Sequence, residues 1–324
     1  MSSAKLPTCP PYISPSTGFL SCLPAAWIPY AELMRVHKPA GIMYIYYPFL
    51  FGSFFAACFS NPIPTPSQMF FANVELFAVA FVLRSVGCTW NDIVDRELDR
   101  KVARCRNRPM ARGALSPTTA YIFTANQYLM LFALLVRNST QCLPYIPPLI
   151  AMGTFYPFAK RITSYAQIVL GFTLSWGTLV GCIMMKVFPL ELGLSPSTMG
   201  LLALSLSYVF WTITYDTIYA FQDIEDDMQA GTMSMAIRHR NHIKPFLFVM
   251  SLIQTGFLVL TGVMISAGPA FYTGVVSTAV LLVQMVAAVK VENPSSCRWW
   301  FKYGALLVGG SEFLSLLGEY LRRL

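Results

Sequence analysis

The sequence predicts an all-α protein that crosses a membrane several times. Of its 324 residues, 55% are hydrophobic and only 12% are charged, and the mean hydropathy is +0.54. These values are rare among soluble globular proteins. The apolar residues also form continuous runs, whereas strands of a membrane β-barrel alternate with a period of two. We therefore expect a polytopic bundle of transmembrane helices.

The positions of the spans follow from windows without Asp, Glu, Lys or Arg. A helix needs about 20 residues to cross the hydrocarbon core of a bilayer. Six windows are free of charge: 39–74, 113–136, 138–159, 162–185, 192–215 and 246–289. The last window is long enough for two helices, with a break near residues 267–270. Two further apolar windows, 70–90 and 303–321, contain only two charged residues each. Together they predict nine transmembrane helices in one membrane domain, residues 31–324.

Residues 1–30 are expected to form a disordered cytoplasmic tail. They are rich in Pro, Ser and Thr and contain one Lys and no Arg. They show neither the basic start and apolar core of a signal peptide nor the Arg-rich amphipathic pattern of a mitochondrial presequence.

Basic residues predict the orientation of the bundle. With nine spans, most of the 23 Lys and Arg residues lie on the side of the N-terminus, and Arg137, Lys186, Arg322 and Arg323 lie on the other. The side rich in Lys and Arg is normally cytoplasmic. Arg35 and Lys38, at the entry to the first span, are interpreted as interfacial anchors. The net charge of +8 thus reflects membrane topology, and we expect no nucleic-acid partner.

Acidic residues are concentrated in two groups, and both groups fall at cytoplasmic ends of expected spans. They hold nine of the 15 Asp and Glu residues: Asp92, Asp95, Glu97 and Asp99, then Asp216, Asp223, Glu225, Asp226 and Asp227. Helical spacing brings several of these oxygens onto one face in each group. Carboxylates so close together need a compensating cation, and hard oxygen ligands suit Mg²⁺. The sequence therefore predicts binding of Mg²⁺.

Basic residues accompany both acidic groups. Arg104 and Arg108 lie in the loop after the first group, and Lys160 and Arg161 lie in the turn between the fourth and fifth spans. Carboxylate-bound Mg²⁺ together with Arg and Lys is a usual way to hold a diphosphate. A diphosphate at the mouth of a hydrophobic bundle indicates a substrate with an apolar tail that runs into the membrane domain.

The chemistry that fits is ionisation of an allylic prenyl diphosphate, in which the metal ions stabilise the leaving group. An electron-rich acceptor then attacks the carbocation. Tyr156 and Tyr219 each lie beside a motif, where their aromatic faces are placed to stabilise a cation.

Two motifs resemble those of a known family. NDIVDRELD (91–99) resembles the first aspartate-rich motif, NDxxDxxxD, of the UbiA superfamily of intramembrane prenyltransferases, and DTIYAFQDIEDD (216–227) resembles the second. NRPMARGALS (107–116) and the segment from residue 156 also resemble family segments, and the similarity extends from about residue 30 to the C-terminus. One departure is Met233, where the family usually has a basic residue.

The resemblance implies roles for individual residues. One Mg²⁺ is expected at Asn91, Asp95 and Asp99, and the other at Asp223 and Asp227. The donor diphosphate is expected to meet Arg104, Lys160 and Arg161. The catalytic residues are expected to be Asp95, Asp223 and Lys160.

The sequence is similar to the fungal meroterpenoid branch of that family, whose members farnesylate polyketide-derived phenolic acids such as dimethylorsellinic acid. We therefore expect farnesyl diphosphate as the donor, an aromatic acid as the acceptor, and a location in the endoplasmic reticulum membrane. The alternatives are a 4-hydroxybenzoate polyprenyltransferase of ubiquinone biosynthesis, which in eukaryotes normally carries a mitochondrial presequence, and a membrane terpene cyclase, which needs the same motifs. A transporter is a remote alternative, because the acidic residues of transporters lie near the midplane of the bilayer, whereas the two acidic groups of this sequence lie at the ends of expected spans.

Overall fold

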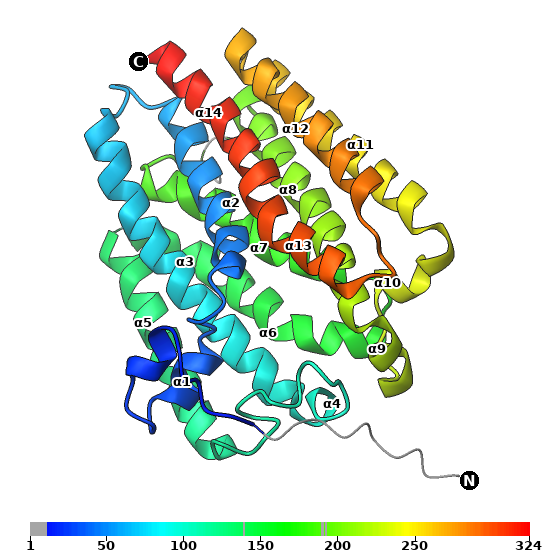
Figure 1. The fold of residues 1–324 in the computed structure, drawn as a ribbon. Coiled ribbons are helices and arrows are strands. Elements are labelled where there is room, and N and C mark those ends of the chain that lie inside the picture. Colours follow the sequence, from blue (N-terminus) through cyan, green and yellow to red (C-terminus); the bar gives the residue numbers. More distant parts are fainter. Residues whose placement is uncertain (1–11, 139, 189–190, 192) are drawn as a thin grey trace.

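The computed structural model describes residues 12–138, 140–188, 191 and 193–324, and every regular element in these residues is a helix (Figure 1). The predicted all-α class is confirmed. The long helices are α2 (Ala40–Ala57), α3 (Pro66–Val94), α5 (Pro117–Asn138), α6 (Ile146–Ile162), α7 (Ala166–Met184), α8 (Pro196–Ala220), α11 (Ile243–Met264) and α12 (Pro269–Ala288). The short ones are α1 (Ile28–Leu33), α4 (Arg96–Asp99), α9 (Ile224–Ala230), α10 (Met235–Arg238), α13 (Pro294–Gly304) and α14 (Gly310–Arg323).

Seven of the described helices are long and apolar enough to cross a membrane, which makes the chain an integral membrane protein. The expected number of nine is not established. Helix α6, with 17 residues, is short for a span, and the last expected span is divided into α13 and α14 by a π-helical turn, Ala305–Gly309. The break expected near residues 267–270 is confirmed, since α11 ends at Met264 and α12 begins at Pro269.

Helix α8 forms the centre of the bundle, where it packs on α7 and α11, while α2 packs on α7 and α3. The approach of α2 to α7 depends on glycine. A Cβ atom at Gly52 would lie 2.0 Å from the carbonyl oxygen of Thr178, so the two backbones meet only because no side chain separates them. The close contact fixes the angle at which α2 and α7 cross.

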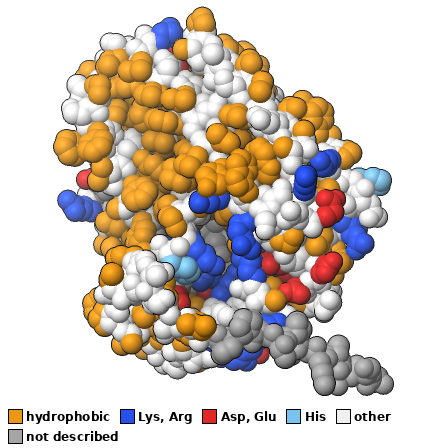
Figure 2. Space-filling model, in the orientation of Figure 1, with side chains coloured by type: hydrophobic (Ala, Val, Ile, Leu, Met, Phe, Trp, Pro, Cys, Tyr) orange, Lys and Arg blue, Asp and Glu red, His pale blue; other side chains and the backbone are white. Residues whose placement is uncertain are grey.

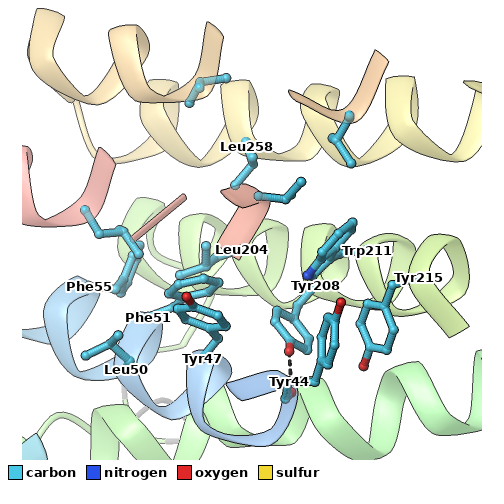
Figure 3. Packing of buried hydrophobic residues seen from close by; sticks show 14 of the residues in the cluster. Tyr44, Tyr47, Leu50, Phe51, Phe55, Leu204, Tyr208, Trp211, Tyr215 and Leu258 are labelled. Carbon is cyan, nitrogen blue, oxygen red and sulfur yellow. Dashed lines mark hydrogen bonds between the residues drawn. The ribbon is translucent and has the colours of Figure 1, made fainter. Parts of the chain in front are cut away.

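The interior beside α8 is aromatic (Figure 3). The rings of Tyr44 and Tyr215 stack with their centroids 3.8 Å apart, and the ring of Trp211 lies 5.3 Å from that of Tyr215. The hydroxyl of Tyr208 donates to the carbonyl oxygen of Tyr44. Because these rings fill the bundle centre, α8 is a rigid support for the residues at its C-terminal end.

The expected tail is partly structured. Residues 1–11 lie outside the described residues, whereas residues 12–30 include a 3₁₀ turn, Phe19–Cys22, and the start of α1. Helix α1 crosses the predicted boundary between tail and membrane domain, and its Leu33 is fully buried. The described part of this segment therefore packs on the bundle, and the boundary at residue 30 does not coincide with a structural break.

Candidate active site

The first acidic motif lies where α3 ends. Asp95 leaves the helical conformation (φ −88°, ψ 9°), and α4 begins at the next residue. The backbone N–H of Asp95 still donates to the carbonyl of Asn91 at 2.8 Å, and that of Asp99 to the carbonyl of Asp95 at 2.7 Å. The four-residue register therefore survives the break, and Asn91, Asp95 and Asp99 keep one common face. Both carboxylates are buried.

The second acidic motif is divided. Asp216 and Tyr219 lie on α8, a 3₁₀ turn follows over Phe221–Asp223, and Asp227 lies on α9. The regular helical spacing that was expected to bring the oxygens of this group onto one face is therefore interrupted, because the tighter turn changes the rotation per residue between Tyr219 and Asp223.

Arg104 joins the loop after α4 to the second motif. Its guanidinium donates to both carboxylate oxygens of Asp223 at 2.5–2.9 Å and to the hydroxyl of Tyr219 at 2.7 Å. One residue before it, the N–H of Ala103 donates to Asp226 at 2.8 Å. The predicted diphosphate contact Arg104 and the predicted metal ligand Asp223 are therefore side by side.

Arg108 joins the same loop to the first motif. It donates to both oxygens of Asp99 at 2.9 and 3.0 Å, and to Asp92 at 3.3 Å. Burial raises the pKa of Asp99 to about 6, although the charge of Arg108 acts to lower it. Asp92 is fully buried and also pairs with Arg35 at 2.5 Å. Asp92 thus faces two guanidinium groups.

Lys160 lies between the two motifs. Its ammonium is 3.5 Å from Asp95 and 3.4 Å from the side-chain oxygen of Asn91. It also interacts electrostatically with Asp216 and Asp227 of the second motif. Because α6 reaches this point at its last turn, Lys160 connects both acidic groups.

The neighbours of Lys160 complete that corner of the site. Arg161 donates to the carbonyl of Val94 at 2.8 Å and to Asp95 at 3.4 Å. The ring of Tyr156 lies 4.9 Å from the ammonium of Lys160, within the range of a cation–π contact. Every site residue predicted from the sequence is therefore at one end of the bundle.

Figure 2 shows Lys and Arg side chains gathered in a hollow near this end, with Asp and Glu beside them and a mostly hydrophobic surface above. A polar hollow next to an apolar surface suits a ligand with a charged head and an apolar tail.

The donor set fits Mg²⁺ better than a transition metal. Among the described residues, no three His, Cys, Asp or Glu side chains converge as a complete metal site. Mg²⁺ does not need one, because it takes one or two carboxylates and completes its shell with water and substrate phosphates. The oxygens of Asn91, Asp95, Asp99, Asp223 and Asp227 are of the required kind.

Two arginines at the end of the bundle that carries the acidic motifs were not predicted from the sequence as part of the site. Arg35, interpreted as an interfacial anchor, pairs with Asp92. Arg84, tolerated within an apolar window, donates to the carbonyls of Arg35 and Lys38 at 3.1 and 2.6 Å. Arg84 itself could have indicated this role in the sequence, because an arginine within a spanning helix is energetically costly unless it has a specific partner.

Comparisons with known proteins show which family the chain resembles. The model of the UbiA prenyltransferase family matches residues 45–309. The prenyltransferase ascA of Acremonium egyptiacum is 36% identical over 265 residues, which cover 81% of this chain and 76% of that protein. The mitochondrial 4-hydroxybenzoate polyprenyltransferase of Schizosaccharomyces pombe is 34% identical, covering 90% and 80%. A solved UbiA homolog from Archaeoglobus fulgidus, bound to GPP and Mg²⁺, has the same fold, with a TM-score of 0.62, 16% identity, and 89% and 99% coverage.

Proposed function

The chain belongs to the UbiA prenyltransferase family and is an aromatic prenyltransferase, and from that premise we propose that it transfers a farnesyl group from farnesyl diphosphate to a polyketide-derived phenolic acid with Mg²⁺ as cofactor. The observation that carries the proposal is the meeting of two acidic motifs and four basic side chains at one end of an apolar bundle: Arg104, Arg108, Lys160 and Arg161.

The acidic side chains have the proposed role of holding the metal. Asn91, Asp95 and Asp99 would bind one Mg²⁺, and Asp223 and Asp227 the other. Mg²⁺ bound there would neutralise the charge that develops on the departing diphosphate. Support comes from the shared face of the first three residues and from the electrostatic interaction of Asp223 with Asp227.

The basic side chains have the proposed role of holding the donor. In the structure each of these four side chains pairs with a carboxylate. Binding of the donor would therefore replace the carboxylate partner by phosphate oxygens. For Arg104 and Arg108 this exchange preserves the number of charge-assisted hydrogen bonds. Lys160 and Arg161 have only long contacts with Asp95, at 3.5 and 3.4 Å, and therefore lose little when they turn to a phosphate.

Aromatic side chains beside the motifs have the proposed role of stabilising the cation. The ring of Tyr219 lies 4.2 Å from that of Phe301, which in turn lies 4.8 Å from that of Tyr44. An allylic cation formed beside Arg104 would meet these π faces before it met water. The ring of Tyr156 lies 4.9 Å from the ammonium of Lys160 and offers a further π face. The C–O bond of the donor breaks and its electron pair leaves with the diphosphate, while the acceptor ring forms the new C–C bond. The attacked ring carbon then releases its proton to the departing diphosphate, which restores aromaticity.

We place the site at the cytoplasmic surface of the endoplasmic reticulum, with residues 31–324 as the membrane domain. This orientation is supported by the positive-inside distribution of Lys and Arg. Prenylation of 4-hydroxybenzoate is the second candidate, favoured by the similarity to the fission-yeast protein of that name.

The experiment uses microsomes that contain the full chain, supplied with farnesyl diphosphate, Mg²⁺ and a panel of phenolic acids that includes 4-hydroxybenzoate. We expect a prenylated phenolic acid only when acceptor and Mg²⁺ are both present. A parallel incubation replaces farnesyl diphosphate by a longer prenyl diphosphate, and a preference for 4-hydroxybenzoate with that donor would support the second candidate. Terpene products that form without acceptor would overturn transfer in favour of cyclisation.

A further inference from the structure

We propose that the N-terminal strap, residues 12–35, is part of the donor-binding machinery and that Glu32 is a positioning residue for the arginine loop, residues 100–113. The inference rests on the proposed function, because its target is the loop that presents Arg104 and Arg108. Residues 12–30 of the strap were expected from the sequence to be part of a disordered tail.

The first contact between strap and loop is an ion pair with little access to water. The carboxylate of Glu32 accepts from Arg112 at 2.6 Å and from the hydroxyl of Tyr12 at 2.9 Å. The side chains of Glu32 and Arg112 are 10% and 14% exposed. Removing one partner of such a pair leaves an uncompensated charge, so its loss is felt more than that of a surface pair.

The same guanidinium also shapes the loop. Arg112 lies over the ring of Tyr12 at 3.7 Å, and its other terminal nitrogen donates to the carbonyl of Asn107 at 2.6 Å. Arg112 therefore connects the strap to the residue that immediately precedes Arg108. A change at Glu32 is transmitted to Arg108 through this short path.

The second contact is shared through Asp92. Arg35 reaches this buried carboxylate from the strap at 2.5 Å, and Arg108 reaches it from the loop at 3.3 Å. Arg35 has a left-handed backbone (φ 57°), which is unfavourable for a residue with a side chain. Its N–H donates to the carbonyl of Glu32 at 3.0 Å, and Arg84 donates to its carbonyl at 3.1 Å. Strain of this kind persists where the surroundings determine the conformation, often at functional sites.

An apolar contact accompanies the ion pairs. Leu33 of the strap, Ile93 of α3, Met110 of the loop and Ala120 of α5 form one buried cluster. The strap and the loop thus share a small core, which explains how a short helix such as α1 keeps its place.

The arginine loop is consequently held from two sides. Glu32 and Asp92 hold it on the side of the strap, while Asp223 and Asp226 hold it on the side of α9. Donor binding must exchange the contacts with the acidic motifs, but it leaves the pair between Glu32 and Arg112 in place. The strap is therefore the fixed reference that keeps the loop, and with it Arg108, in position during the exchange.

The test compares Glu32→Gln, Arg112→Gln and the charge swap Glu32→Arg/Arg112→Glu in the full chain. Glu292→Gln is the matched control, because this exposed carboxylate lies between α12 and α13, outside the strap, the loop and both acidic motifs. We expect each single variant to raise the KM for farnesyl diphosphate about tenfold, the size expected for a lost charge-assisted hydrogen bond. The KM for the acceptor stays unchanged, and the swap restores part of the loss.

Two results would overturn the proposal. One is an unchanged donor KM in Glu32→Gln. The other is a parallel loss of donor affinity, acceptor affinity and thermal stability that the swap does not restore, since that pattern marks general destabilisation. Binding of inorganic pyrophosphate with Mg²⁺ to each variant supplies a readout that needs no turnover. If the wild type binds pyrophosphate but prenylates no phenolic acid, the proposed function fails and the strap is still tested.

Discussion

Acidic side chains form ion pairs at both ends of the bundle, but the pairs differ in kind. At the end that carries the C-terminus (Figure 1), Glu319 accepts from Arg322 and Arg323 at 2.6 Å each, three and four residues further along the same helix. At the opposite end, Asp95 and Asp223 meet basic partners that lie 65 and 119 residues away in the sequence.

The difference separates a structural clamp from an exchangeable site. Glu319 also accepts the N–H of Gly268 at 2.8 Å, and its fully buried side chain fixes the turn between α11 and α12. Asp95, in contrast, has two cations at 3.4 and 3.5 Å, and neither contact is short. The long, shared contacts of Asp95 can be replaced by a ligand at little cost. The pair of Arg104 with Asp223 is short, at 2.5 Å, but it joins two segments far apart in the sequence, whereas the pairs of Glu319 lie within one helix.

The largest expected effect follows from removing a carboxylate of the exchangeable end. We expect Asp223→Ala and Asp95→Ala each to lower turnover about 1,000-fold or more, because a proposed metal ligand and an anchor for a basic side chain are both lost. Turnover in microsomes is the measurement, with membrane insertion as the control. Substantial activity in both variants would show that these carboxylates do not hold the metal.

Lys160→Met comes next. This ammonium interacts with both motifs, and a side chain of similar size without charge should lower kcat/KM for the donor about 100-fold. Lys160→Arg keeps the charge and should retain part of the activity. Equal losses in the two variants would indicate a packing role.

A smaller effect concerns pH. Burial lowers the pKa of Lys38 to about 8, and repulsion from Arg35, Arg104 and Arg108 adds to the shift. The side chain is therefore charged below pH 8 and loses its proton as the pH rises through that value. The charges of Arg104 and Arg108 act on Lys38, so we expect its ammonium to add to the attraction that these arginines exert on the donor diphosphate. Loss of that charge should raise the KM for the donor about fivefold between pH 7 and pH 9, the size expected of one partly exposed charge. Lys38→Arg, which stays charged, should abolish this dependence, and an unchanged profile would rule Lys38 out.

The smallest effect on activity belongs to the clamp. Glu319→Gln should leave kcat/KM within about twofold of the wild type, while the midpoint of thermal unfolding in detergent falls by a few degrees. Activity and unfolding are measured on the same preparation. A loss of activity without a change in the midpoint would contradict the assignment of Glu319 to structure.

The same contrast explains what the sequence could predict. The acidic motifs could be predicted because their residues lie close together in the sequence. Lys160 and Arg104 could be predicted because they were expected to accompany those motifs. The pairs of Glu32 with Arg112 and of Arg35 with Asp92 join residues 80 and 57 positions apart, and no local pattern records such a pairing. The 3₁₀ turn at Phe221–Asp223 was missed because regular helical spacing was assumed through the motif.

The most direct measurement compares two arginines, one from each end. Arg104 and Arg322 both pair with a carboxylate, so Arg104→Gln and Arg322→Gln remove the same chemistry in different places. Binding of radiolabelled farnesyl diphosphate with Mg²⁺ to purified protein is the readout. We predict that affinity falls about 100-fold in Arg104→Gln and is unchanged in Arg322→Gln. Equal losses in both variants, or wild-type affinity in Arg104→Gln, would contradict the assignment of the donor site to the end that carries the two motifs.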